Sequence, residues 1–141
     1  MKKITKILGI IVLIGIVLFA LIQLVPYGRN HKNPPVVQEP NWDAQTRAIA
    51  KKACFDCYSN EVTWPWYSHI APVSWLVQRD VYEGRRKLNF SDWGRGGRET
   101  GELAEVIQAG EMPPFQYTLI HTSARLTAAE KQTLIQGLAG K

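Results

Sequence analysis

The sequence Cys54-Phe-Asp-Cys-Tyr-Ser-Asn-Glu-Val-Thr-Trp-Pro-Trp-Tyr-Ser-His-Ile-Ala-Pro-Val-Ser-Trp75 joins a C-x-x-C pair to a loop rich in aromatic residues and proline. Cys54 and Cys57 are the two cysteines of the 141-residue chain. Just upstream, Asn41 or Asp43 can cap a helix that runs to about Ala53. We therefore expect this helix to deliver the cysteine pair at its C-terminal end.

Three further helices are expected downstream, and no alternating strand pattern of useful length is present. Pro72 suits the first position of a helix that reaches Gly84. The next is expected from about Glu99 to Ala109, with a glycine as its stop. The last begins at Thr127, whose Thr-Ala-Ala-Glu sequence is a capping box. The sequence therefore predicts a small all-α domain with long loops.

The N-terminal part carries a long apolar run over residues 7–25, interrupted once by Gln23. At about 1.5 Å per residue this run spans roughly 28 Å, close to the ~30 Å hydrocarbon core of a bilayer. The lysines within residues 1–6 favour a cytoplasmic N-terminus. A cleaved signal peptide usually has a shorter apolar core and a small-x-small site, so we expect an uncleaved, single-pass transmembrane helix.

Residues 26–40 hold four of the eight prolines, which predicts an extended stalk between the anchor and a folded domain over residues 41–141. This order places the domain on the extracytoplasmic side of the cell membrane, in a periplasm or at the cell surface. Beyond the anchor, 14 basic residues face 12 acidic ones, a net charge of only +2. That balance gives no case for a nucleic-acid partner.

The C-x-x-C pair is compatible with three kinds of site. C-x-x-C-H is the pattern of covalent haem attachment, but Tyr58 stands here at the histidine position. A redox-active or structural disulfide is the second kind, although the thioredoxin type expects a βαβ context. Half a zinc site is the third, and three scattered histidines suit it poorly. A pair at the end of a short helix in an all-helical domain favours haem and its iron.

The quoted stretch resembles the bacterial haem-binding domain family, a c-type-cytochrome-like group of membrane-anchored proteins. The resemblance continues through 81–93, Gly-Glu-Met-Pro-Pro over 110–114 and Tyr-Thr-Leu-Ile-His over 117–121, and it covers about 41–137. It implies a cytochrome-c-like helical fold and c-type haem held covalently by Cys54 and Cys57. It also implies electron transfer or redox sensing, with a redox protein as partner. The family has histidine directly after the second cysteine, so Tyr58 leaves the proximal iron ligand open.

Four residues are candidate iron ligands. Tyrosinate is a known haem ligand, but a phenol titrates near 10, so iron and nearby cations would have to lower the pKa of Tyr58. His69 and His121 are the other candidates for the proximal ligand. Met112 is the expected distal ligand, because its thioether lies in a Gly-x-Met-Pro-Pro loop stiffened by two prolines.

Trp64, Trp66 and Tyr67 are expected either to fill a small core or to form the wall of the haem site. Arg85 and the two basic residues after it are candidates for offsetting propionate charge. The sequence contains no Ser–His–Asp order, phosphate loop or H-E-x-x-H, so no catalytic residue is expected and the protein is taken to be no enzyme.

Three alternatives stay open. In the first, the chain is a haem-less family member that acts as a thiol-redox or disulfide-stapled module, with a Cys54–Cys57 disulfide. In the second, it is an interaction domain whose aromatic surface binds a partner. In the third, Tyr58 is a single-base change from histidine in an otherwise ordinary cytochrome.

Overall fold

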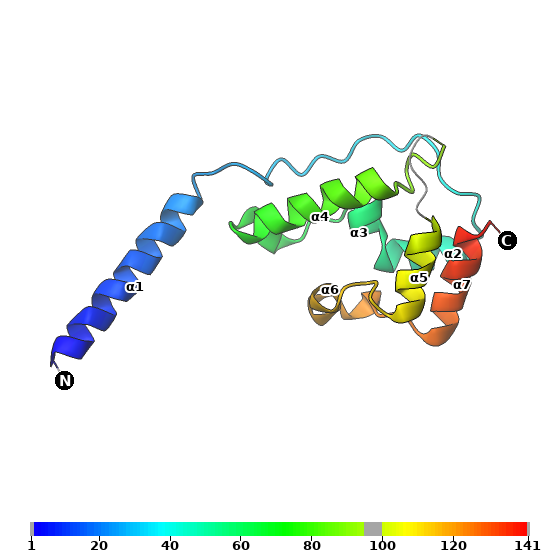
Figure 1. Cartoon of the computed structure of the whole chain (residues 1–141). Coiled ribbons are helices and arrows are strands. Elements are labelled where there is room, and N and C mark those ends of the chain that lie inside the picture. Colours follow the sequence, from blue (N-terminus) through cyan, green and yellow to red (C-terminus); the bar gives the residue numbers. More distant parts are fainter. Residues whose placement is uncertain (1, 95–99, 141) are drawn as a thin grey trace. The chain divides into compact units, whose positions relative to one another are not determined.

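A computed structural model describes residues 2–94 and 100–140, and within them the chain is all-helical (Figure 1). The predicted all-α class is confirmed. The helices are α1 (Lys2–Ile22), α2 (Ala44–Ala53), α3 (Phe55–Tyr58), the 3-10 helix η1 (Trp66–His69), α4 (Val73–Lys87), α5 (Thr100–Ala109), α6 (Phe115–Ile120), the 3-10 helix η2 (Thr122–Ala124) and α7 (Ala128–Leu138). Pairing of the β type is limited, in the described ranges, to one isolated bridge between Gln38 and Asp92.

The helix starts follow the capping residues of the sequence. Asp43 caps α2, since its carboxylate accepts hydrogen bonds from the Thr46 backbone N–H and hydroxyl, both at 2.8 Å. Thr127 caps α7, and the reciprocal bond from Glu130 completes the expected capping box. Glu99, the expected start of the third of the predicted helices, lies outside the described residues, and α5 is described from Thr100.

The helix expected to end at Gly84 continues to Lys87. Gly84 is buried inside α4, and the three basic residues that follow it form the last turn of the helix. Positive side chains near a helix C-terminus interact favourably with the backbone carbonyls there. The sequence pattern therefore placed the end one turn too early, because this glycine serves close packing instead of termination.

The described residues form two compact units, each considered by itself. Unit 2 comprises residues 33–63, 80–94 and 100–140, and its core is built from α2, α5 and α7, with α5 and α7 side by side (Figure 1). Its largest fully buried side chains are Phe55, Phe90, Ile107 and Leu134. Trp42, just before α2, is joined to α7, because its indole N–H donates to the Gly137 carbonyl oxygen at 2.9 Å.

Residues 33–38, part of the segment predicted as a stalk, are bonded within unit 2. Asn60 Nδ2 donates to the Pro35 carbonyl oxygen at 2.9 Å, and the Val37 N–H donates to the Ser91 carbonyl oxygen at 2.8 Å. The Gln38 carbonyl oxygen accepts from the Trp93 N–H at 2.9 Å. This length of the chain is extended, and its backbone follows the surface of the folded unit.

Unit 1 comprises residues 2–32 and 64–79. Its helix α1 is the one helix of the described chain that is long and apolar enough to cross a membrane, and none of its central residues is buried. The helix ends at Ile22, three residues before the end of the predicted anchor. The Gln23 side-chain amide then bonds both backbone groups of Ala71, donating to its carbonyl oxygen and accepting from its N–H, each at 3.0 Å.

Candidate functional site

The C-x-x-C pair lies where α2 passes into α3. Cys54 ends α2 by donating its N–H to the Ala50 carbonyl oxygen at 2.8 Å. Its own carbonyl oxygen then accepts from the N–H groups of Cys57 and Tyr58, at 3.1 and 2.9 Å, which forms the single turn of α3. Both cysteines are free and half-buried. The local backbone therefore places two thiols and a phenol within one helical turn.

The two thiols are held in their neutral form. Burial raises the pKa of Cys54 to about 12, and the neighbouring Cys57 adds to the shift. Burial likewise raises the pKa of Cys57 to about 12, with smaller contributions from the carboxylates of Asp80 and Asp56. Thiolates, and not thiols, attack disulfides and bind zinc. Neither cysteine has the low pKa typical of a thiol–disulfide oxidoreductase.

Helix α4 packs directly on this turn. Gly84 is buried, and a Cβ there would overlap the Cys57 carbonyl oxygen and lie 3.0 Å from its carbonyl carbon. In the loop after α4, the Phe90 N–H donates to the Tyr58 carbonyl oxygen at 2.8 Å. Arg85 Nε donates to the Ser59 carbonyl oxygen at 2.7 Å, and burial lowers the pKa of its guanidinium. The C-x-x-C turn is thus held from one side by α4 and the loop after it.

Tyr58 and Met112, predicted as ligands from separate parts of the sequence, line the same cleft. It has a volume of about 70 Å³, and its other lining residues are Lys87, Leu88, Glu102, Leu103 and Val106. Both side chains, together with Cys54, also pack against the buried core of unit 2. The structure therefore brings the residue after the second cysteine and the methionine of the Met-Pro-Pro loop to one place.

The turn after α5 positions Met112. Gly110 has a φ of +81°, a left-handed conformation that favours glycine, and it ends the helix as the sequence predicts. The N–H groups of Glu111 and Met112 both donate to the Val106 carbonyl oxygen, at 2.9 and 3.2 Å. These bonds fold the loop back over the end of α5, so that the thioether lies against the core.

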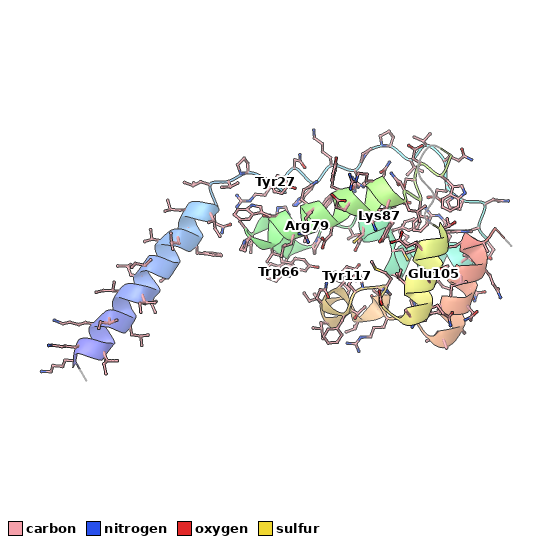
Figure 2. The ribbon with its side chains drawn as sticks, viewed as in Figure 1. Tyr27, Trp66, Arg79, Lys87, Glu105 and Tyr117 are labelled. Atoms are coloured by element: carbon pink, nitrogen blue, oxygen red, sulfur yellow. The ribbon has the colours of Figure 1, made fainter. Side chains whose placement is uncertain are left out.

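A carboxylate between the two cysteines connects them to α6. Asp56 Oδ1 accepts from the Thr63 N–H at 2.9 Å, and Oδ2 accepts from the Tyr117 hydroxyl at 2.7 Å (Figure 2 labels Tyr117). The Tyr117 ring stacks on His121, with ring centroids 4.3 Å apart and planes 17° apart. His121 is therefore connected to the C-x-x-C turn through Tyr117 and Asp56, but it does not line the cleft. Sequence reasoning missed Asp56 and Tyr117, because nothing in the local pattern pairs residues 61 positions apart.

The remaining predicted site residues belong to unit 1. His69 meets the ring of His31 edge to face, with centroids 4.3 Å apart, and Trp64 stacks on the same imidazole at 4.6 Å. Trp66 is 75% exposed and contacts Tyr67 edge to face at 5.8 Å. The cleft lined by Tyr58 and Met112 belongs to unit 2.

The donors of unit 2 fit a covalently attached haem in their chemistry. Two free thiols can form thioethers, and a phenol and a thioether are both known haem-iron ligands. The cleft is smaller than the roughly 300–1,000 Å³ of ordinary ligand pockets. Haem needs a pocket at least as large as these. Its binding therefore requires the side chains that line the cleft to move apart.

Comparison with protein families identifies a match over most of the chain. A family model described as a haem-binding domain matches residues 17–140, which include both cysteines, Tyr58 and Met112. No curated protein and no solved structure matches the chain.

Proposed function

The chain belongs to the haem-binding domain family, and we propose that it is a membrane-anchored, extracytoplasmic protein that holds c-type haem and serves electron transfer or redox sensing. One observation carries the proposal beyond the family level. The two free thiols of the C-x-x-C turn lie next to Tyr58, and Tyr58 shares a cleft with the loop methionine Met112.

Each residue has a distinct role in this proposal. Cys54 and Cys57 would hold the porphyrin through thioether bonds, and Met112 would be the distal iron ligand. Tyr58 would stand at the proximal position, and His121, which stacks on the Tyr117 ring that bonds Asp56, is the candidate histidine of unit 2. When bound, haem would supply an iron that changes between Fe(II) and Fe(III). The buried core behind Cys54 and Tyr58 would exclude water from that side of the group.

The location follows from α1 and its charges. The helix is 21 residues long, enough to span a hydrocarbon core of ~30 Å. Lys2, Lys3 and Lys6 precede its apolar part. Positive residues stay preferentially on the cytoplasmic side. We therefore place residues from Gln23 onwards outside the cytoplasm.

Covalent attachment predicts complete loss of bound haem in the Cys54→Ala/Cys57→Ala variant. The full-length chain would be exported in a host with cytochrome c maturation and then analysed by haem stain after denaturing electrophoresis and by intact mass. The wild type should keep the stain and carry the mass of one haem, whereas the double variant should lose both. Tyr82→Phe, a change on the exposed side of α4, should leave both unchanged. A wild-type mass of the apoprotein minus two protons would refute the proposal and indicate a disulfide.

If Met112 binds the iron, Met112→Leu should change the absorption spectrum and the reduction potential of the iron and leave the fold unchanged. Leucine keeps the volume of the side chain, and such exchanges usually cost below about 1.5 kcal/mol. The loss of the thioether should abolish the methionine-to-iron charge-transfer absorption and lower the reduction potential, on the order of 0.1 V within the ~0.8 V that axial ligands span. Absorption spectroscopy and redox titration of the holoprotein measure both. An unchanged spectrum would show that Met112 only packs in the core.

A further inference from the structure

Hydrogen bonds between Gln23 and Ala71, here called the clasp, join the end of α1 to a distant loop of the chain. The side-chain amide of Gln23 bonds both backbone groups of Ala71. The Arg29 guanidinium in turn donates to the Gln23 backbone carbonyl oxygen at 2.7 Å and to the Gln23 side-chain oxygen at 2.9 Å. Gly28, with a φ of +79°, is buried where a Cβ would lie 2.7 Å from the Ser74 carbonyl carbon. Ala71 and Ser74 are therefore held beside the point where the apolar helix ends.

Unit 1 carries positive charge and no acidic residue. All 12 Asp and Glu residues of the chain lie outside residues 1–32 and 64–79. Beyond the end of α1, the same unit contains two exposed basic residues, Lys32 and Arg79, besides the half-buried Arg29 that bonds Gln23. A surface of this composition is attracted to anionic lipid headgroups, at about 1 kcal/mol for each basic residue close to the membrane.

The same unit leaves large apolar and aromatic side chains exposed. Trp66 is 75% exposed, Leu24 is 78% exposed, and Leu76 is 51% exposed on the helix that follows the clasp. Tyr27 and Trp66 are labelled in Figure 2. Tryptophan and tyrosine concentrate at membrane interfaces, where an apolar ring and a polar N–H or O–H are both satisfied.

The chain length between the clasp and Trp66 is short. Ala71 is five positions after Trp66, and four residues of 3-10 helix, as in η1, advance only about 8 Å. A side chain at that distance from the end of a transmembrane helix is within reach of the headgroup region, which adds roughly 5–8 Å to each side of the hydrocarbon core.

From the clasp, the charge and the exposed indole, we propose that the loop of unit 1 that carries Trp66 docks on a bilayer with anionic headgroups. This second membrane contact, in addition to the span of α1, would hold the loop that follows the haem-attachment motif at the membrane surface. The inference relies on α1 crossing the bilayer, and it does not depend on covalent haem attachment.

Hydroxyl-radical footprinting of the full-length chain in nanodiscs tests this docking. The internal reference is Tyr82, an α4 residue of unit 2 that is 60% exposed. Each oxidation rate is divided by the intrinsic reactivity of its residue type, so that the two side chains can be compared. By exposure alone, Trp66 should be the more reactive. Docking on discs that contain phosphatidylglycerol should reverse this order and protect Trp66 at least about fivefold relative to Tyr82.

Two further variants of the experiment separate the causes of protection. In purely zwitterionic discs, the protection of Trp66 should fall about threefold, and protection independent of lipid charge would overturn the assignment to anionic headgroups. Protection that rises with the number of chains per disc would indicate a second copy as the occupant and overturn the proposal. So would a Trp66 that stays more reactive than Tyr82. Retention of the chain in membranes after an alkaline wash tests the span of α1 separately.

Discussion

Replacing Gly84 with valine is expected to separate α4 from the C-x-x-C turn and to abolish covalent haem attachment. Even a single Cβ at this position would overlap the Cys57 carbonyl oxygen, and backbone cannot move aside as a flexible side chain can. Overpacking of this kind costs about 1–3 kcal/mol or more, which exceeds the gain of under 1 kcal/mol from removing a helical glycine. Denaturant unfolding of the full chain and haem stain would measure both effects.

Gly101 provides the matched control for Gly84. It also lies within a helix, α5, but a Cβ there would meet nothing within 4 Å. Gly101→Val should therefore leave haem attachment intact and stabilise the protein by up to about 1 kcal/mol. Equal behaviour of the two glycine variants would contradict the close packing of α4 on Cys57.

Phe90→Ala is expected to cost about 3–5 kcal/mol, a large share of the roughly 5–15 kcal/mol that stabilise a typical domain. Phe90 is fully buried, and its ring centroid lies 5.0 Å from Trp42, 5.8 Å from Phe55 and 6.3 Å from Tyr58. Its loss would leave a cavity behind the proximal position of the candidate site. Urea unfolding followed by tryptophan fluorescence should show a lower midpoint with a similar slope.

The exposed phenylalanine of α6 is the control for Phe90. Phe115 is 73% exposed, so Phe115→Ala should change the free energy of unfolding by no more than about 0.5 kcal/mol. If the two substitutions shifted the unfolding midpoint equally, Phe90 would not belong to the core that supports Tyr58.

The sequence alone predicted the features that depend on neighbours along the chain. Asp43 and Thr127 marked helix starts because a cap bonds a backbone N–H only three residues away. Gly110 marked a helix end, and the apolar run of α1 was evident from its length and composition. The all-α class and the haem-binding family also followed, since both rest on contiguous patterns such as the C-x-x-C pair and the Met-Pro-Pro loop.

The short helices and the true end of α4 did not follow from the sequence. Segments such as α3 and α6 span four and six residues, too few to show a helical period. Gly84 suggested a helix end because glycine is common there, but in the structure it allows α4 to approach Cys57. Propensity describes a residue in isolation, whereas the packing partner that decides this position lies 27 residues away.

The tertiary structure decided how the site and its surroundings are assembled. It brought Tyr58 and Met112 to one cleft, joined Asp56 to Tyr117, and clasped Gln23 to Ala71. These contacts join residues about 50 or more positions apart, and such pairs are specified by shape complementarity and the satisfaction of buried polar groups across the whole fold. The residues along the chain thus supply the chemistry that is present, namely thiols, a phenol, a thioether and an apolar span. Which of these groups share one site was decided only when the chain packed.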